Sequence, residues 1–301
     1  MTQLSTRTPP PVSKGPPPVS KGPSPVVEGL KSVYRKPLGI LDDLGDQLSF
    51  YVRSLAWTPR TLRRYKREVL RLLTEVSFGS GALAVIGGTV GVIVFITFFT
   101  GTEVGLQGYQ ALQQIGSSAF TGFVSAYFNT REISPLVAAL ALSATVGCGF
   151  TAQLGAMRIN EEVDALEVMG LPSLPFLVTT RMIAGFVAVI PLYVIALLSS
   201  YAATRFIATG YFGQSAGTYD YYFHLFLPPE DVLWSFFKVL VFSVLVILIH
   251  CYYGYNASGG PAGVGLAVGR AVRLAIVSVN IVDFFLSLAI WGTTTTVRVV
   301  G

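Results

Sequence analysis

One short segment of the chain, Gly155–Gly170, combines acidic side chains with a helix-prone sequence. Its acids are Glu161, Glu162, Asp164 and Glu167. Carboxylates at this spacing could form ion pairs with basic residues of a partner protein, and Arg158 could pair with Glu162 four positions away. Long uncharged apolar runs flank the segment on both sides. Because charges are costly in lipid, the segment must lie at a membrane face, where a soluble partner can reach it.

The same segment carries apolar residues at helical spacing. They follow one another at steps of four, three and three residues: Ile159, Val163, Leu166 and Met169. Such a stripe forms one face of a helix, which could sit in a groove of a cytoplasmic motor protein and receive force from it. The alternative is a solvated helix in a loop, without a partner.

A second set of residues could act on an apolar substrate. Its members lie at or just beyond the outer end of the first apolar run: Phe95, Phe98, Phe99, Leu106 and Tyr109. They are candidates for the lining of a lipid path, with ordinary helix packing as the alternative. Asp283 is an acid inside an apolar run, where it costs about 3 kcal/mol unless it faces protein or water. It could form a hydrogen bond across a helix bundle or shape the substrate path.

Other polar side chains in apolar surroundings are expected to be satisfied locally. Arg131 and Glu132 should pair with neighbours at the end of an apolar run, and His250 should make a helix–helix contact. Cys148 and Cys251 both lie in apolar runs, where small core residues are expected.

Patterns typical of catalytic and nucleotide sites are missing from the sequence. There is no GxxxxGK[ST] phosphate loop, so any ATP hydrolysis needs a site on another chain. The HExxH motif, a nucleophile elbow and clustered metal ligands are also missing. We therefore expect no catalysis by this chain and no bound metal or cofactor.

The composition is typical of a polytopic membrane protein. Of the 301 residues, 52% are hydrophobic and 12% are charged, whereas soluble domains carry about 25% charged residues. We predict an all-α integral membrane protein, because several apolar runs exceed about 18 residues. The five predicted spans are Ala82–Thr100, Ile133–Gln153, Met182–Thr204, Val232–Tyr253 and Leu274–Thr296. The net charge of +5 comes from basic residues before the first span and gives no sign of nucleic-acid binding.

The segments between the spans are less clearly defined. Val104–Thr130 is uncharged and long enough to cross a membrane, but its glutamines are costly in lipid. We expect it to form helices on the outer face or packed within the protein; if it spans, the later topology inverts. Arg205–Asp231 is predicted to be a polar loop and Gly254–Gly269 a glycine-rich loop.

The N-terminal part precedes the membrane bundle. Residues 1–37 repeat PPPVSKG and are predicted to be a disordered, Pro-rich tail. Residues 38–57 have the pattern of an interfacial amphipathic helix. Residues 58–81 form a basic elbow helix, with Thr58 as N-cap and Pro59 in its first turn. Its Arg and Lys residues place the N-terminus, and with it the acidic segment, on the cytoplasmic side.

Four segments, in this order, resemble the MlaE/YrbE family of ABC-transporter permeases. They are GLQGY at Gly105–Tyr109, REISPLVAAL at Arg131–Leu140, TAQLGAMRINEEVDALEVMG at Thr151–Gly170 and VDFFLSL at Val282–Leu288. The similarity covers residues 38–301, which we take as one permease domain. The Pro-rich extension and the EEVDAL sequence look most like the actinobacterial YrbE subunits, of the B type, in Mce (mammalian cell entry) lipid-import systems.

The resemblance implies partners and a role. It implies a multi-pass permease of the inner (plasma) membrane that pairs with a second YrbE-type permease as a heterodimer. A cytoplasmic ABC ATPase dimer would bind ATP and Mg²⁺, and a hexamer of Mce proteins would deliver a fatty acid, mycolic acid or sterol for import. It also implies a coupling helix at Arg158–Met169. Two residues depart from the bacterial MlaE pattern: Gln153 replaces an acid, and Asp164 replaces a small polar residue.

Two other functions compete with this one. A secondary transporter would need ionisable groups inside the membrane, and by sequence only Asp283 clearly qualifies. A non-transporting membrane anchor of an envelope lipid-binding complex would need no ATPase.

Overall fold

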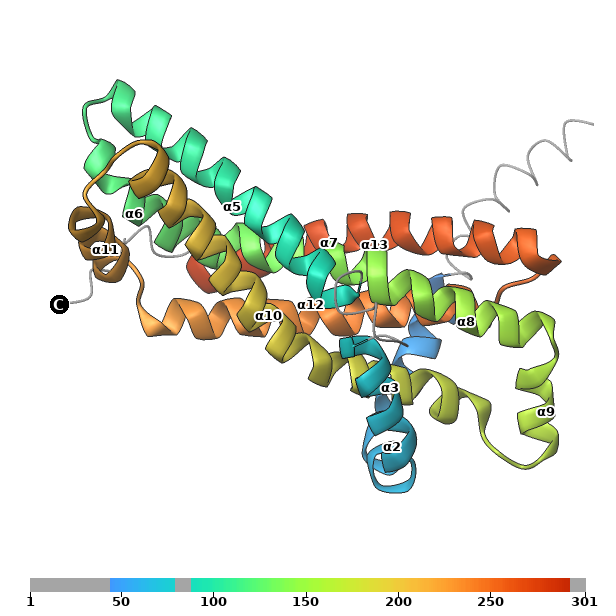
Figure 1. Ribbon diagram of the computed structural model, residues 1–301. Helices are drawn as coiled ribbons and strands as arrows, with labels where there is room; N and C mark the ends of the chain where they lie inside the picture. Colours follow the sequence, from blue (N-terminus) through green and yellow to red (C-terminus); the bar gives the residue numbers. More distant parts are fainter. Residues whose placement is uncertain (1–43, 79–87, 293–301) are drawn as a thin grey trace, which may run out of the picture. The chain divides into compact units, whose positions relative to one another are not determined.

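The structure, a computed structural model, describes residues 44–78 and 88–292 of the chain (Figure 1). Several predictions therefore lie outside the described residues: the Pro-rich tail 1–37, the start of the interfacial helix at 38–43, and the segments 79–87 and 293–296. The chain divides into two units, 1–48 and 49–301. In the first unit, residues 44–48 are helical.

Every regular element in the described part of the chain is a helix. The second unit begins with helical residues 49–56. The elements that follow are α2 (Thr58–Arg64), α3 (Lys66–Phe78), α5 (Thr89–Gln114), η1 (Ser118–Phe120), α6 (Thr121–Val124), η2 (Ser125–Ile133), α7 (Ser134–Leu142), η3 (Ser143–Gly147), α8 (Cys148–Ile159), α9 (Glu162–Val168), η4 (Pro175–Thr179), α10 (Thr180–Phe206), η5 (Ile207–Tyr211), α11 (Ala216–Leu225), α12 (Pro229–Tyr255) and α13 (Gly260–Trp291). The segments η2, η3, η4 and η5 are π-helical.

Within the described residues, five helical segments are long and apolar enough to cross a membrane, which confirms the predicted fold class and number of spans. They are Thr89–Gln114, Ser118–Ile159, Pro175–Tyr211, Pro229–Tyr255 and Gly260–Trp291. With a rise of 1.5 Å per residue, even the shortest of them is about 39 Å long, more than the ~30 Å thickness of the hydrocarbon layer. The helices therefore carry residues beyond the lipid as well as within it.

The first span lies further along the chain than predicted. α5 does not end at Thr100 but continues through three glycines, Gly101, Gly105 and Gly108, to Gln114. A Cβ atom on Gly101 would lie 2.5 Å from the carbonyl oxygen of Ser200 in α10. This close approach of two backbones stabilises α5 at residues that would weaken an isolated helix.

Val104–Thr130 forms a helical hairpin, and its two halves belong to the candidate spans Thr89–Gln114 and Ser118–Ile159. Its first half is the end of α5, Gly116 turns the chain with a φ of +68°, and its second half leads through η1 and α6 into η2. The glutamines of α5 are exposed, whereas Asn129 in η2 is buried and donates a hydrogen bond to Thr204 Oγ1 at 2.9 Å.

The prediction of a glycine-rich loop at Gly254–Gly269 is wrong, because most of this segment belongs to α13. That helix begins at Gly260, with Pro261 in its first turn, where the missing N–H costs nothing. Its glycine-rich part packs against α8: a Cβ atom on Gly155 would lie 2.8 Å from Cγ1 of Val264. Tertiary contact therefore offsets the low helix propensity of glycine.

Two further predictions on local structure are corrected. The polar loop Arg205–Asp231 contains the helix α11. The elbow helix 58–81 is interrupted at Tyr65, whose ring packs edge-on against Phe176 at a centroid distance of 5.3 Å. Thr58 is not the N-cap of α2 but its first residue, and Trp57 takes the cap position without a side-chain bond.

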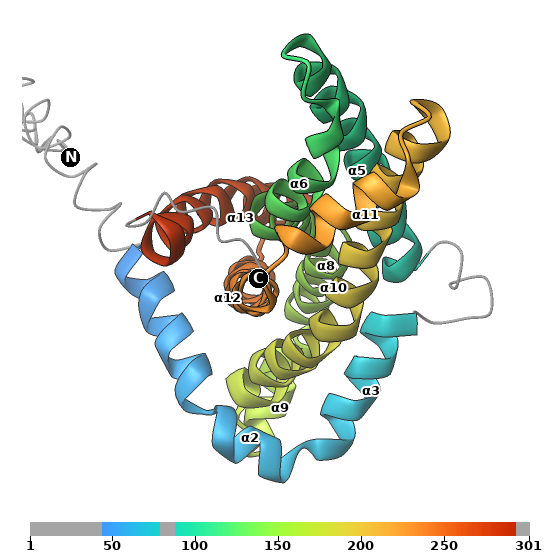
Figure 2. The ribbon, with the colours of Figure 1, turned by 90° about the vertical axis from the view of Figure 1, so that its left-hand side faces the viewer.

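The helix α12 lies in the middle of the bundle. Figure 2 shows it end-on, with α13 on one side and α8 and α10 on the other, and it contacts all three. The residues of α12 that face these neighbours are buried, among them Phe242, Val246 and Ile247. A polar side chain on the inner part of α12 can therefore reach several other helices.

Candidate functional site

The predicted coupling segment is not a continuous helix. α8 ends at Ile159, and Glu161 takes a left-handed conformation with φ of +61° before α9 begins at Glu162. The expectation of one helix over Arg158–Met169 is wrong in this respect. Figure 1 shows the consequence: α9 runs across the end of α8 instead of extending it.

An ion pair links the two sides of this corner. Arg158 Nη1 in the last turn of α8 lies 2.6 Å from Oδ1 of Asp164 in α9. The sequence predicted Glu162 as the partner of Arg158, but the reversal at Glu161 turns Asp164 toward Arg158 instead. Both side chains are more than a third exposed, so the pair contributes no more than about 1 kcal/mol.

The C-terminal end of α9 is fixed by a glycine and by a contact to α12. Gly170 has a φ of +75°, and the next N–H, of Leu171, donates to the carbonyl oxygen of Leu166 at 3.0 Å. This is the bonding of a Schellman motif. Ser173 Oγ then donates to Glu167 Oε1 at 2.5 Å and lies 2.7 Å from the hydroxyl of Tyr255 at the end of α12.

The apolar side chains of α9 divide between the protein and the outside. Val163 has no exposed surface, and Leu166 packs partly buried against the core. Val168 is 88% exposed and Met169 is 66% exposed. The segment is thus anchored by one apolar face and displays a second apolar surface at its end.

The five residues predicted to line a lipid path lie on α5. Phe95, Phe98 and Phe99 are exposed, and the rings of Phe95 and Phe99 are 4.5 Å apart. Leu106 is half-buried, and Tyr109 stacks on Phe212 at 4.0 Å. The helix therefore presents an open aromatic surface near its middle and packs against η5 and its neighbours near its end.

Asp283 faces the interior of the bundle and pairs with Lys238 of α12. Nζ of Lys238 lies 2.7 Å from Oδ1 of Asp283 and 3.2 Å from Oε2 of Glu132. Ser287 joins the two sides, because its Oγ donates to Glu132 Oε1 at 2.8 Å and accepts from Lys238 at 2.8 Å. The expectation that Asp283 was the one clear ionisable group inside the membrane is wrong.

A second ion pair adjoins the first. Arg131 Nη2 lies 2.6 Å from Asp231 Oδ2, and both side chains are buried. Trp291 Nε1 donates to the other carboxylate oxygen of Asp231 at 2.9 Å, and the Arg131 guanidinium lies over the ring of Tyr127. Arg131 and Glu132 therefore have the neighbours that the sequence predicts for them. Both belong to the π-helical segment η2, a geometry often found at functional sites.

Comparison with known proteins identifies the family. A family model described as Permease MlaE matches residues 78–289, well over half of the chain. The chain belongs to the MlaE permease family.

Similar proteins include TRIGALACTOSYLDIACYLGLYCEROL 1 of Arabidopsis thaliana, 29% identical over 199 residues, which cover 66% of this chain and 57% of that protein. A probable ABC transporter permease of Synechocystis is 29% identical over 223 residues, covering 74% and 81% of the two chains. One of Rickettsia bellii is 28% identical over 196 residues, covering 65% and 76%. The chain thus spans little more than half of the Arabidopsis relative.

Membership in the MlaE family makes the chain a multi-pass permease subunit of an ABC transporter and not its ATPase. A permease of this kind requires a partner ATPase. The ends of the MlaE bundle differ in character: Figure 1 shows α9 at the same end as the turn between α12 and α13, and the hairpin after α5 at the other end.

Gln153, one of the two residues expected to depart from the bacterial MlaE pattern, lies in a charged contact. Gln153 of α8 donates from Nε2 to Oε1 of Glu75 at 2.7 Å, and its Oε1 lies 3.4 Å from Nη2 of Arg181. Arg181 is buried, and its Nη1 donates to the carbonyl oxygen of Leu177. The carboxylate in this contact thus belongs to Glu75 of α3, which is linked to Arg181 through Gln153.

Sequence reasoning predicted the contact of His250 and missed Lys238. His250 lies between Ser143 Oγ at 2.9 Å and Thr151 Oγ1 at 2.8 Å, which confirms a satisfied helix–helix contact. Lys238 and Asp231 were not singled out. A lone cation inside the predicted span Val232–Tyr253 was a usable signal, because such a group needs a partner within the bundle.

Proposed function

We propose that this permease couples ATP hydrolysis on a partner ATPase to the movement of a lipid through the membrane. ATP and Mg²⁺ would bind the ATPase, and this chain would bind neither. The observation that carries the proposal is the corner formed by α8 and α9. There two strongly exposed apolar side chains, Val168 and Met169, stand at the end of a segment that is firmly bonded to α12 through Glu167 and Ser173.

Force transmission follows from this geometry. A partner that grips Val168 and Met169 can move α9, and the contacts of Glu167 and Ser173 with Tyr255 pass that motion to α12. The acids Glu161 and Glu162 are exposed beside this surface and would meet basic residues of the ATPase. Energy is transmitted only if the two nucleotide states of the ATPase differ in their contacts with α9.

A lipid is the substrate that we propose. The Arabidopsis relative is named after trigalactosyldiacylglycerol, a lipid. The exposed aromatic surface of Phe95, Phe98 and Phe99 on α5 supports a path for acyl chains, continuing past Leu106 and Tyr109. Following the resemblance to actinobacterial YrbE subunits of the B type, we propose a fatty acid, mycolic acid or sterol, moved in the direction of import.

A second permease would complete the lipid path. In the most apolar part of the spans that contain α5 and α13, only 22% and 17% of the residues are buried inside the protein. In the other three spans the buried share is 50% to 56%. We propose that these two poorly covered helices face another YrbE-type permease in a heterodimer, beneath a hexamer of Mce proteins. The assembly would lie in the plasma membrane, with the N-terminus and α9 on the cytoplasmic side.

The test is affinity purification of the full chain from membranes, with identification and ATPase assay of the proteins that accompany it. Val168→Glu places a charge on the proposed contact. Ile115→Glu places the same charge on the residue that follows α5, which is 72% exposed and lies at the opposite end of the bundle from α9 (Figure 1). We expect wild type and Ile115→Glu to bring down an ATPase, and Val168→Glu to lose it while keeping its membrane partners. Glu161→Lys with Asp164→Lys should have the same effect.

Two outcomes would count against the proposal. If Val168→Glu and Ile115→Glu retain the ATPase equally, the partner does not bind the end of α9. If the intact wild-type complex contains no ATPase, the chain serves as a non-transporting membrane anchor of an envelope complex.

A further inference from the structure

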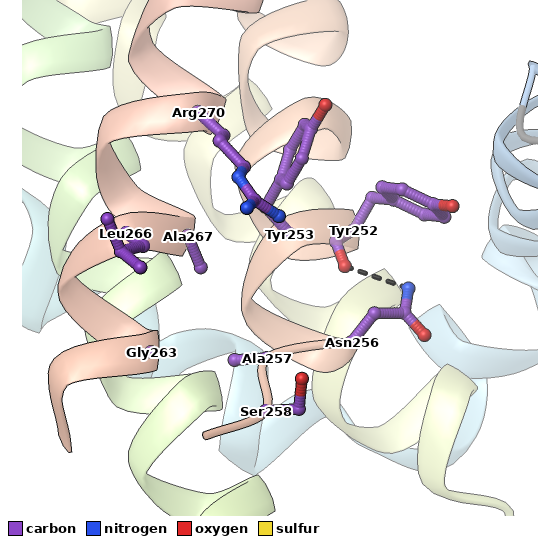
Figure 3. Close-up of a pocket in the computed structure, with 9 residues that line it drawn as sticks. All are labelled: Tyr252, Tyr253, Asn256, Ala257, Ser258, Gly263, Leu266, Ala267 and Arg270. Atoms are coloured by element: carbon purple, nitrogen blue, oxygen red, sulfur yellow. Dashed lines mark hydrogen bonds between the residues drawn. The ribbon is translucent and has the colours of Figure 1, made fainter. Parts of the chain in front are cut away.

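A cavity of about 250 Å³ opens between the end of α12 and the beginning of α13 (Figure 3). Small and apolar residues form part of its wall, and the polar part consists of Tyr252, Tyr253, Asn256, Ser258 and Arg270. None of the lining residues is acidic. The cavity therefore offers hydroxyl, amide and guanidinium groups around one positive charge.

The charge of Arg270 is available to a ligand. Its side chain is exposed, and within the described part of the chain it forms neither an ion pair nor a side-chain hydrogen bond. By contrast, Asn256 uses its amide nitrogen to donate to the carbonyl oxygen of Tyr252 at 2.9 Å, which closes the end of α12 (Figure 3). The ring of Phe50 packs edge-on against the ring of Tyr252, at a centroid distance of 5.4 Å, and so supports this wall of the cavity.

The position of the cavity relative to the membrane follows from the course of α13. From Leu274 to Trp291 the helix rises about 27 Å, close to the ~30 Å of the hydrocarbon layer. Along this stretch it exposes apolar side chains such as Val277, Ile281 and Phe284. With Leu274–Trp291 placed in the hydrocarbon layer, Arg270, one turn earlier, lies at the level of the lipid headgroups. Two tyrosines on α12 at this level fit the aromatic belt of a membrane interface.

We propose that this cavity binds the phosphate-bearing, anionic headgroup of a membrane lipid. The guanidinium of Arg270 can hold two phosphate oxygens at once, and the hydroxyls of Ser258 and Tyr253 can bond to the remaining polar atoms of the headgroup. The exposed side chain of Leu266 at the rim offers apolar contact. A soluble phosphate compound shares the phosphate chemistry, and the position of the cavity at headgroup level favours the lipid.

The site is separate from the proposed transport path on α5 and does not depend on it. It lies beside Tyr255, whose hydroxyl contacts Ser173 at 2.7 Å. A bound headgroup would therefore stiffen the end of α12 to which α9 is bonded. Lipid composition could in this way influence the corner that the ATPase is proposed to grip.

The test is native mass spectrometry of the full-length chain, purified from membranes with its partners and stripped of loosely bound lipid. Phosphatidylglycerol, phosphatidylcholine and inorganic phosphate are added separately. Arg270→Gln removes the charge in the cavity. Arg273→Gln removes an equally exposed charge one turn further along α13 that does not line the cavity. Ala267→Leu fills the cavity without changing its charge.

We expect wild type and Arg273→Gln to bind one phosphatidylglycerol in preference to phosphatidylcholine. Arg270→Gln should weaken this binding about tenfold, as expected for the loss of a charge-assisted hydrogen bond. Ala267→Leu should weaken it as well, and an unchanged thermal midpoint of that variant shows that it still folds.

The proposal is overturned if Arg270→Gln and Arg273→Gln weaken binding equally, because the attraction is then diffuse. It is also overturned if a folded Ala267→Leu binds phosphatidylglycerol as wild type does. If inorganic phosphate displaces phosphatidylglycerol at millimolar concentration and the two lipids bind alike, the occupant is a soluble phosphate compound and not a lipid.

Discussion

Nζ of Lys238 lies 2.7 Å from Oδ1 of Asp283, and the Lys238 side chain has no exposed surface. The carbonyl oxygen of Arg131 at 2.7 Å and the hydroxyl of Ser287 at 2.8 Å also surround the ammonium group, with Glu132 slightly further away. One side chain of α12 thus bonds to η2 and to α13. A cation buried in this way is stable only while its acidic partners remain.

Removal of this cation should destabilise the permease strongly. Lys238→Met leaves Asp283 and Glu132 without a counter-charge, and breaking a buried ion pair costs about 3–5 kcal/mol. We expect the free energy of unfolding, measured by titration with a denaturing detergent, to fall by that amount. The double variant Lys238→Met/Asp283→Asn should be more stable than the single variant.

Arg71→Gln is the matched control for Lys238→Met. Arg71 pairs with Glu68 at the surface, where its side chain is 67% exposed, so its loss should cost less than about 1 kcal/mol. Equal effects of the two substitutions would show that Lys238 is solvated and not enclosed by its partners.

The contact between α5 and α10 leads to a second prediction. A Cβ atom at Gly101 would collide with the backbone of Ser200, whereas one at Gly149 would meet no atom within 4 Å. Gly101→Ala should therefore lower stability by about 1–3 kcal/mol, the usual cost of overpacking. Gly149→Ala should be neutral or stabilising, because alanine favours the helix by about 1 kcal/mol.

Thermal unfolding of both glycine variants in the same detergent checks this prediction. A lower midpoint for Gly149→Ala than for Gly101→Ala would contradict the close packing of α5 on α10.

The spans and the acidic segment could be predicted because each depends on local sequence. A run of apolar residues is long enough to cross lipid or it is not, and Glu161 and Glu162 cannot lie in lipid at any register. The start of α13 could not be predicted in this way. Its glycines disfavour a helix, and the contact that stabilises them joins Val264 to Gly155, more than a hundred residues earlier.

The sequence predicted which residues belong to the candidate site, but it did not predict which residues they contact. Asp283 was singled out because an acid in lipid is costly unless it has a partner. Its partner Lys238 could not be predicted, since Lys238 also bonds to Glu132, which lies 106 residues before it in the sequence. The left-handed conformation of Glu161 likewise gives Arg158 the partner Asp164 in place of the predicted Glu162. Spacing along the chain says which groups need partners, and the packing of helices decides which partners they receive.

A third prediction concerns the charge near Arg181. Glu75→Gln keeps a hydrogen bond to Gln153 but removes the negative charge from this contact, so the thermal midpoint should fall. Adding Gln153→Glu places a carboxylate directly beside Arg181, where Gln153 Oε1 now lies 3.4 Å from Nη2. The double variant Glu75→Gln/Gln153→Glu should recover the lost stability, since hydrogen bonds to charged groups are worth about 1.5–3 kcal/mol.

The control for this rescue is Glu103→Gln, which removes an exposed acid from a different helix, α5. Gln153→Glu should give it no comparable gain. A double variant less stable than Glu75→Gln alone would show that position 153 does not face Arg181.

A fourth prediction concerns acid and the end of α10. Arg205 holds the carboxylate of Asp220 through two hydrogen bonds of 2.8 and 2.9 Å, and these bonds lower the pKa of Asp220 below its ordinary value of 3.8. Because the folded pKa is the lower one, the contribution to stability is complete well above pH 3.8 and is lost as the pH falls through the folded pKa. Both groups are exposed, so the effect should be confined to α11.

Hydrogen exchange of the α11 amides, compared between wild type and Asp220→Asn at equal pH, measures this effect. At pH 7 the variant should exchange faster, because the neutral amide of asparagine bonds to Arg205 more weakly than the carboxylate does. As the pH falls through the folded pKa of Asp220, which lies below 3.8, wild type loses its charge and the ratio of the two rates should approach one. A ratio that stays constant across this range would mean that Arg205 does not stabilise α11 through the charge of Asp220.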